Sequence, residues 1–508
     1  MNRRTFLRGA VALGGAVTLG SRFPASAVDD TELATSVLNG PAGSCPVETI
    51  VVICMENRSF DHYFSWLASD ERYLEAGRNR YGSDFFVDGR RDLTYVRPDG
   101  SEAEPFHLPG WADTTDPYRG CGGHPDPNHG RGGGLVQRDQ GFVAQGSGND
   151  DFAIGYYDEA DLPCYAQLAR HMTIFDRYHC SLLASTYPNR EYLHSAQSGG
   201  HMDNYTPYAE LGFTWPTIWD RLKPAGVSGG LYATDIPTTA LWGTRLLSIT
   251  NPIAKLFADA ELGLLPQVTF IDPGVISGER TDDHPHGDMR MAQRWVASVI
   301  AALQASPQWD RMAIFVTYDE WGGFFDHVRP PVLPDDRTTD DEATTFGLSG
   351  FRLPVTLTSP YARPGYVDHT QYDHTSILRF IEWRYLGAPA EGPGGDGWWL
   401  TARDRSANNI GAALVEQRLN DFVLDDVAVP IVVSTPCDSQ VFQDVPGASD
   451  VEDKYLTPTL HQLGVNVDQL DTEIVVSSEV SAFEVSRDLW ETLGFDTTPS
   501  MSLSELLG

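Results

Sequence analysis

Short apolar runs recur along the chain, and each ends in polar or acidic residues. The first, at 49–55, is rich in β-branched residues and is followed by Glu56 and Asn57. A continuous apolar run of this kind is typical of a strand that is buried on both faces of a parallel sheet. Comparable runs predict strands at 267–271, 312–317 and 353–358.

Segments with a helical period lie between these runs. Their apolar spacing predicts helices at 217–222, 289–305 and 376–385. A further helix is expected at 189–198, after an extended stretch at 175–183. Strands that alternate with amphipathic helices indicate an α/β fold, in which helices cover both faces of a mainly parallel sheet.

Two segments, 98–150 and 387–397, lack this periodicity and are expected to form loops. The first is rich in Gly, Pro, Asp and His, and a loop of that length in a compact enzyme is usually functional. It contains His107, His124 and His129. We therefore interpret it as an insertion beside an active site.

The first 27 residues have the features of an export signal. Residues 2–7, NRRTFL, match the twin-arginine pattern, and a weakly apolar stretch at 9–20 is followed by Ala25-Ser26-Ala27, which fits a signal-peptidase site. We predict a twin-arginine signal peptide at 1–27, recognised by the twin-arginine export machinery. The mature protein is then expected in the periplasm, at the cell surface or secreted.

The remaining chain is expected to comprise a catalytic domain, 28–420, and a small, more acidic C-terminal extension, 421–508. Removal of the signal peptide takes away four arginines and no acid, so the formal charge changes from −34 to −38. Such a field repels phosphate backbones and disfavours a nucleic-acid partner. No segment after residue 27 is apolar for long enough to cross a membrane, so no transmembrane segment is expected.

Acidic residues follow two of the predicted strands. Glu56 and Asn57 follow the first, and Asp319 and Glu320 follow the run at 312–317. The carboxyl ends of such strands line the crevice in which open α/β sheets bind ligands. Together these residues offer an all-oxygen pocket for one divalent cation. The alternatives are a helix-entry turn, with Asn57 or Ser59 capping the segment at 61–66, and a solvated strand end at Asp319 and Glu320.

A hydroxyl pair, Ser185-Thr186, directly precedes the helix expected at 189–198. Backbone N–H groups and the helix dipole favour phosphate at such a position. A cation touching Thr186 would lower the pKa of its hydroxyl and make it a usable nucleophile. The alternative is that Ser185 or Thr186 only caps the helix.

Five ordered motifs resemble those of the bacterial phosphoesterase family, which holds phospholipases C and a type of periplasmic acid phosphatase within the alkaline phosphatase superfamily. The resemblance spans about residues 45 to 385 and implies an alkaline-phosphatase-like three-layer core with long loop insertions. The motifs are ENRSFDHYF at 56–64, TYPNR at 186–190, DHP at 283–285, DEWGGFFDHV at 319–328 and DHTSILRF at 373–380.

The resemblance also implies roles for individual residues. Thr186 would be the nucleophile that forms a covalent phospho-threonine, and it would also touch the metal. His129 would contact phosphate, and His284 would contact phosphate or protonate the leaving oxygen. The cofactor would be one divalent ion, with calcium, magnesium, manganese and zinc left open. The protein ligands of that ion would be Glu56, Asn57, Asp319 and Glu320.

The chain departs from the family pattern near two of its histidines. No tryptophan follows His129, which leaves His124 as a substitute, and His286 stands where relatives often carry proline. His327 is expected to orient the acid pair at 319–320, and His374 to mark the entry of the helix at 376–385.

The sequence thus predicts an exported, metal-dependent hydrolase of phosphoric esters, either a phospholipase C-like phosphodiesterase or an acid phosphatase. Its substrate would be a small-molecule or lipid phosphate ester. A sulfatase is disfavoured because threonine cannot be converted to formylglycine. The alternatives are a non-catalytic exported protein that binds phosphate esters, and a phosphotransferase.

Overall fold

An eight-stranded sheet forms the centre of the computed structural model, which describes residues 34–108, 118, 124–207, 212–275, 281–285, 287–392 and 398–425. β11 runs opposite to the other seven strands of this sheet, all of which run in one direction. In order across the sheet, the strands are β12 (Tyr366–Asp368), β6 (Thr173–Phe175), β11 (Val355–Thr358), β10 (Met312–Tyr318), β1 (Thr49–Met55), β9 (Val268–Asp272), β7 (Gly229–Ala233) and β8 (Thr250–Pro252).

Strand β1 lies in the middle of the sheet and is buried at all seven positions. It pairs in parallel with β10 from Thr49↔Met312 to Met55↔Tyr318, and with β9 on its other side. Continuous burial explains the unbroken apolar run, because helices cover both faces. The four strands predicted from the sequence are confirmed. β1 begins and ends at the predicted residues, 49 and 55.

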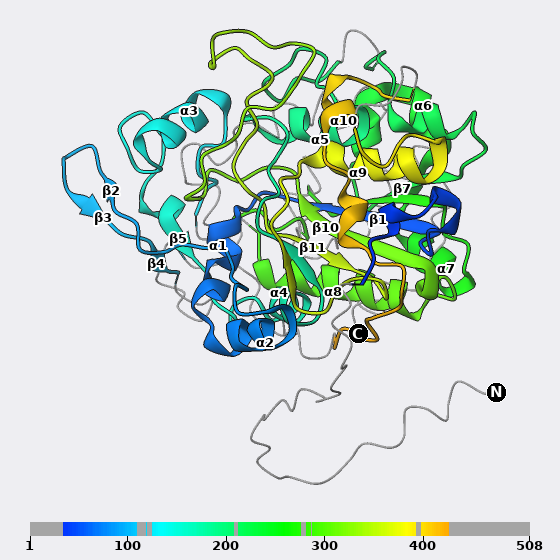
Figure 1. Ribbon diagram of the computed structural model, residues 1–508. Coiled ribbons are helices and arrows are strands. Elements are labelled where there is room, and N and C mark those ends of the chain that lie inside the picture. Colours follow the sequence, from blue (N-terminus) through cyan, green and yellow to red (C-terminus); the bar gives the residue numbers. More distant parts are fainter. Residues whose placement is uncertain are drawn as a thin grey trace, which may run out of the picture. The chain divides into compact units, whose positions relative to one another are not determined.

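Helices form a layer on each side of the sheet, which confirms the expected α/β fold (Figure 1). One layer holds α5 (Thr186–Ser195), α6 (Ile218–Leu222), α9 (His374–Ile381) and α10 (Ala402–Ser406), and the other holds α4 (Pro163–His171), α7 (Ile253–Leu262) and α8 (Met289–Ala305). The remaining described α-helices are α1 (Phe60–Phe64), α2 (Glu71–Tyr81) and α3 (Arg131–Gln140), and short strand pairs join β2 (Tyr95–Val96) to β3 (Glu102–Ala103) and β4 (Phe106–His107) to β5 (Gly155–Tyr156). Among the described helices, none combines the length and the apolar character that a membrane crossing requires.

Three local expectations were wrong. Helix α5 begins at Thr186 rather than at residue 189, because Pro188 in the first turn needs no N–H partner there. The segment at 98–150 contains a helix, α3, which the three glycines at 132–134 conceal in the sequence. Of the extended stretch at 175–183, only Phe175 belongs to a strand.

The two ends of the chain lie largely outside the described residues. This holds for the predicted signal peptide at 1–27 and for most of the predicted extension at 421–508. The described part of that extension packs against the core: Leu424 is buried, and its N–H donates to the side chain of Gln304 on α8.

A network of buried charges joins the segments that follow β1 and β10. The Arg352 guanidinium contacts Asp326 at 2.9 Å and Asp61 at 3.3 Å. The His327 ring contacts Asp61 through Nδ1 at 2.6 Å and Asp88 through Nε2 at 3.1 Å. The sequence led us to expect that His327 orients the acid pair at 319–320. It does not, because its ring nitrogens face the carboxylates of Asp61 on α1 and of Asp88.

This network predicts a pH-dependent stability. Burial alone would lower the pKa of His327, but its contacts with Asp61 and Asp88 outweigh burial and raise that pKa to about 9. Since the folded pKa lies above the unfolded value, the stabilisation is complete below about pH 6.5 and is lost as the pH rises toward 9. The free energy of unfolding, measured in urea, should fall across this window by roughly 2 to 3 kcal/mol more in the wild type than in His327→Gln. Equal slopes for both proteins would contradict the assignment.

Candidate active site

Three neighbouring strands end in acidic residues at the same edge of the sheet. Glu56 and Asn57 follow β1, Asp319 and Glu320 follow β10, and Asp272 is the last residue of β9. All five are buried. The parallel register of β1 and β10 aligns the turns that follow these two strands. The pairing extends one residue past β10, where the Asp319 N–H donates to the Met55 carbonyl at 3.0 Å.

Three of these carboxylates form a cluster that could hold a metal ion. Glu56, Asp319 and Glu320 each offer an oxygen within 4.8 Å of the other two. Burial raises the pKa of Asp319 and of Glu320 to about 7 each, although Arg190 opposes the shift at Asp319 and His129 opposes it at Glu320. Carboxylates are costly to bury together unless a cation compensates them.

Several polar atoms of this cluster have no hydrogen-bond partner among the described residues. They are both amide atoms of Asn57, Oδ2 of Asp319 and Oε1 of Glu320. Buried polar atoms are normally paired, so this concentration needs an explanation. An all-oxygen donor set of three carboxylates and one amide fits a hard divalent cation. The structure thus brings together the four residues that the sequence predicted as protein ligands.

Glycine at position 322 lets the chain after the acid pair approach Asn57. Gly322 has φ +64°, and a Cβ atom there would lie 2.0 Å from the Asn57 carbonyl oxygen. The next residue, Gly323, has φ +71°, and a Cβ atom there would lie 2.7 Å from the Asn128 carbonyl oxygen. Only glycine fits both demands, so the loop insertion closes over the site at this point.

The Thr186 hydroxyl points into the cluster from the first turn of α5. It donates to Oε2 of Glu56 at 3.3 Å, and the residue is buried. Ser185 is the N-cap residue of α5 but makes no side-chain capping bond. The hydroxyl therefore lies where the N-terminus of a ten-residue helix meets the carboxylate cluster.

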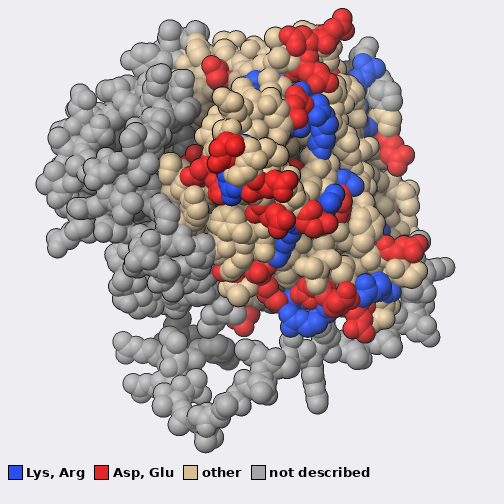
Figure 2. All heavy atoms as spheres, turned by 90° about the vertical axis from the view of Figure 1, so that its left-hand side faces the viewer, with Lys and Arg blue, Asp and Glu red and all other residues tan. Residues whose placement is uncertain are grey.

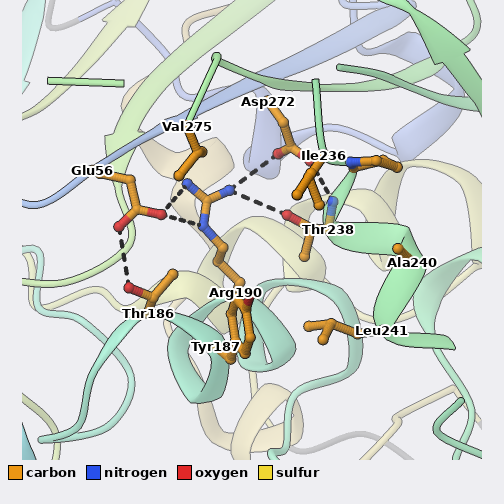
Figure 3. Close-up of a pocket in the computed structure, with 11 residues that line it drawn as sticks. Glu56, Thr186, Tyr187, Arg190, Ile236, Thr238, Ala240, Leu241, Asp272 and Val275 are labelled. Atoms are coloured by element: carbon orange, nitrogen blue, oxygen red, sulfur yellow. Dashed lines mark hydrogen bonds and ion pairs between the residues drawn. The ribbon is translucent and has the colours of Figure 1, made fainter. Parts of the chain in front are cut away.

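Arg190 belongs to the site, although no role was predicted for it from the sequence. Its Nε and Nη2 contact Oε1 of Glu56 at 3.0 and 2.9 Å, and its Nη1 contacts Asp272 at 3.2 Å (Figure 3). It thereby leaves Oε2 of Glu56 to Thr186. The signal in the sequence was its position four residues after Thr186, which places both side chains on one face of a helix.

The structure places His284 at this cluster. Its Nδ1 pairs with Asp282 at 2.6 Å, and its Nε2 lies 3.8 Å from Oε2 of Glu56 and 3.6 Å from Oδ2 of Asp126. His374, the first residue of α9, marks the helix entry as expected, and its Nε2 contacts the Asp319 carbonyl at 2.7 Å. His286 lies outside the described residues.

Of the three histidines in the loop insertion, His129 is the one associated with the acid pair. Its Nδ1 contacts the Pro127 carbonyl at 2.9 Å, and its charge acts on Glu320 strongly enough to oppose the rise in the pKa of that residue. His124 instead pairs with Asp150, and His107 pairs with Asp161. His107 and His124, the predicted substitute for His129, are therefore engaged in interactions away from the acid pair.

A partly open cavity lies beside Thr186 (Figure 3). Its polar lining consists of Glu56, Thr186, Arg190, Thr238 and Asp272. Its apolar wall consists of Tyr187, Ile236, Pro237, Ala240, Leu241 and Val275.

The fold and the site define an α/β protein with a buried group of carboxylates that could hold a metal ion and with a hydroxyl beside that group. The chain matches the Phosphoesterase family over residues 47–386, and it belongs to that family. This confirms the expected family and, with it, the expected enzyme class of phosphoric ester hydrolases.

Known relatives carry phospholipase C names. The chain is 33% identical to "Non-specific phospholipase C1" of Arabidopsis thaliana over 65% of this chain and 66% of the relative. It is 30% identical to "Non-hemolytic phospholipase C" of Burkholderia pseudomallei over 76% of this chain and 61% of the relative. It therefore spans about two thirds of the length of these relatives. A solved structure in the alkaline phosphatase superfamily, from Vibrio parahaemolyticus, is similar at 8% identity with a TM-score of 0.30, over 49% of this chain and 63% of that one.

The carboxylate cluster predicts that a divalent cation stabilises the folded protein. A ligand at 100 times its dissociation constant adds about 2.7 kcal/mol to the free energy of unfolding. Addition of calcium, magnesium, manganese or zinc to protein stripped of metal by a chelator should therefore raise its Tm by several degrees. Glu320→Gln should weaken this shift. Glu191→Gln is the matched control, because Glu191 is a buried acid outside the cluster. A shift of equal size in both variants would contradict the assignment of Glu320.

Proposed function

We propose that this protein is an exported, metal-dependent phosphoric ester hydrolase that acts through a covalent phospho-threonine at Thr186. One observation carries the proposal: the Thr186 hydroxyl lies 3.3 Å from Oε2 of Glu56, at the edge of a carboxylate cluster that fits a divalent cation. Export is proposed from the twin-arginine pattern of residues 1–27.

One divalent ion would be held by Glu56, Asn57, Asp319 and Glu320, with the Thr186 hydroxyl beside it. When bound, the ion would lower the pKa of that hydroxyl and neutralise charge on the phosphoryl group. An oxygen and amide donor set suits calcium, magnesium or manganese, and the nearby histidines keep zinc open.

The side chains themselves divide the remaining work. Oγ1 of Thr186 attacks phosphorus while the bond to the leaving alcohol breaks, and the backbone N–H groups at the start of α5 favour the negative charge. His284 gives a proton to the leaving oxygen, and His129 contacts the phosphoryl group. Water then hydrolyses the phospho-threonine. Arg190 holds Glu56 in place by its two contacts with Oε1.

The cavity beside Thr186 supports an ester with an apolar substituent. Its apolar wall and the Thr186 hydroxyl line the same cavity, so an ester bound with phosphorus at Thr186 could place an alkyl group against Leu241 and Val275. The phospholipase C names of the relatives agree with such a substrate. Because of this lining and these names, we favour a phosphodiester with an apolar group over a small monoester. Figure 2 shows acidic and basic side chains interspersed on one face of the molecule.

Hydrolysis of two chromogenic esters tests the reaction and its preference. The mature protein should release nitrophenol from nitrophenyl phosphocholine faster than from nitrophenyl phosphate. Chelation should abolish both activities, and one metal should restore them. Turnover that survives complete chelation would contradict the metal-dependent mechanism, and faster turnover of the monoester would favour a phosphatase.

Replacement of Thr186 tests the covalent mechanism. Thr186→Ala should lower kcat by at least about 10³-fold, because no other group replaces the attacking oxygen. Thr186→Ser, the matched control, keeps a hydroxyl and should retain measurable turnover. The Tm of both variants should stay close to that of the wild type, since the lost hydrogen bond contributes about 1 kcal/mol. Substantial turnover by Thr186→Ala would exclude the phospho-threonine.

The apolar wall predicts a selective effect on KM. Leu241→Asn should raise KM about tenfold for a nitrophenyl phosphodiester with a long alkyl chain, and should leave KM for nitrophenyl phosphate nearly unchanged. Leu262→Asn is the matched control, because Leu262 is exposed on α7, away from the cavity. If Leu241→Asn affects both substrates equally, the wall does not contact the alkyl group.

A further inference from the structure

We infer that Asp282 is a positioning residue that fixes the ring orientation and tautomer of His284, so that Nε2 is the atom that exchanges a proton with the ester. The inference rests on the proposed function, in which His284 serves the leaving oxygen. Neither the family motif DHP at 283–285 nor the pattern of strand ends assigns a role to Asp282.

The two side chains form a fully buried pair. Oδ2 of Asp282 lies 2.6 Å from Nδ1 of His284, and both residues are inaccessible to solvent. A carboxylate at this distance accepts the Nδ1 hydrogen, so the ring is held by that bond and Nε2 faces the other way. The other side of the ring is the reaction side, because Nε2 and the Thr186 hydroxyl both lie within 4 Å of Oε2 of Glu56.

The backbone between the pair is held in an uncommon conformation. Asp283 has φ +85°, which non-glycine residues rarely adopt. Its carboxylate accepts hydrogen bonds from the Tyr63 and Tyr318 hydroxyls at 2.9 and 2.6 Å. Its carbonyl accepts two from the Arg58 guanidinium, at 2.9 and 2.6 Å. Such strain persists where surrounding contacts impose it, and it clusters at functional sites.

The same turn is tied to the candidate metal ligands. The Glu56 N–H donates to the Asp282 carbonyl at 2.9 Å. Asp282 therefore contacts the site twice, through its carbonyl at Glu56 and through its carboxylate at His284. The strained residue between them turns its own side chain away, toward Tyr63 and Tyr318, and this frees its neighbours to face the cluster.

The chemistry balances as two proton transfers in each half of the reaction. In the first half the Thr186 hydroxyl proton passes to Oε2 of Glu56, to which the hydroxyl already donates, and in the second half it returns when the bond from Thr186 to phosphorus breaks. When the bond from phosphorus to the leaving oxygen breaks, its electron pair stays on that oxygen, which takes the proton from Nε2 of His284. The neutral ring then accepts a proton from the water that attacks the phospho-threonine. Throughout, Asp282 keeps the other ring proton on Nδ1, as the carboxylate of a catalytic triad does for its histidine.

A leaving-group series tests this role. Asp282→Asn keeps the shape of the side chain but removes its charge. It should lower kcat/KM about 10²-fold for esters of alkyl alcohols, whose leaving oxygen needs a proton. Nitrophenyl esters, whose leaving oxygen is stable without one, should lose less than about fivefold. A merely structural defect would lower kcat/KM equally for both series, and that result would overturn the inference.

Two controls keep the outcome unambiguous. Asp259→Asn replaces another buried aspartate that accepts side-chain hydrogen bonds, and it should leave both series unchanged. In a His284→Ala background, Asp282→Asn should have little further effect on kcat/KM, because the two residues act as one unit. Additive losses would overturn the inference. A wild type that hydrolyses no ester in either series would instead refute the proposed function.

A spectroscopic measurement covers the case in which Asp282→Asn fails to fold. With ¹⁵N-labelled histidine in the wild type, the His284 signals, assigned by their loss in His284→Gln, should show Nδ1 carrying the hydrogen. A ring protonated at Nε2 alone would overturn the inference independently of any activity.

Discussion

The burial of four carboxylates at the ends of three adjacent strands is the constraint on which the rest of the site depends. Parallel pairing of β10, β1 and β9 brings Glu56, Asp272, Asp319 and Glu320 to one edge, where all four are buried. Like charges in such surroundings repel strongly. The Arg190 guanidinium offsets part of this charge by bridging Glu56 and Asp272. The remaining acids and the Asn57 amide retain atoms without a hydrogen-bond partner, and the proposed cation would satisfy them.

In a second acidic group, a side chain of the protein itself supplies the positive charge. Asp61, Asp326 and His327 also lie close enough together to hold a metal ion. There, however, Arg352 supplies a cation from within the protein and contacts both aspartates. The Arg352 guanidinium neutralises part of the charge of that group, so the group links α1 to the segment after β10 and needs no bound cation for this. The two groups have similar composition, and they differ in whether the described structure already pairs their oxygens.

The strands and the candidate metal ligands could be predicted because both depend on local sequence. A buried strand demands an unbroken apolar run, and the residues after it must lie at the edge of the sheet, which located Glu56 and Asp319. The contacts of Arg190 and the partners of His327 could not be predicted, since they join residues far apart in the chain. Helix α3 was missed because its glycines have poor helix propensity, which tertiary packing overrides.

The single reversed strand limits where this site can change. β11 follows β10 across the sheet but runs the other way, so its carboxyl end lies at the far edge and cannot extend the pocket. On the other side, β9 and β7 run with β1 and deliver their following loops to the same edge. Ile236 and Leu241 follow β7, and Val275 follows β9. The aliphatic residues of the cavity therefore all come from this flank of the sheet, so substitutions there alter the cavity without altering the ends of β1 and β10.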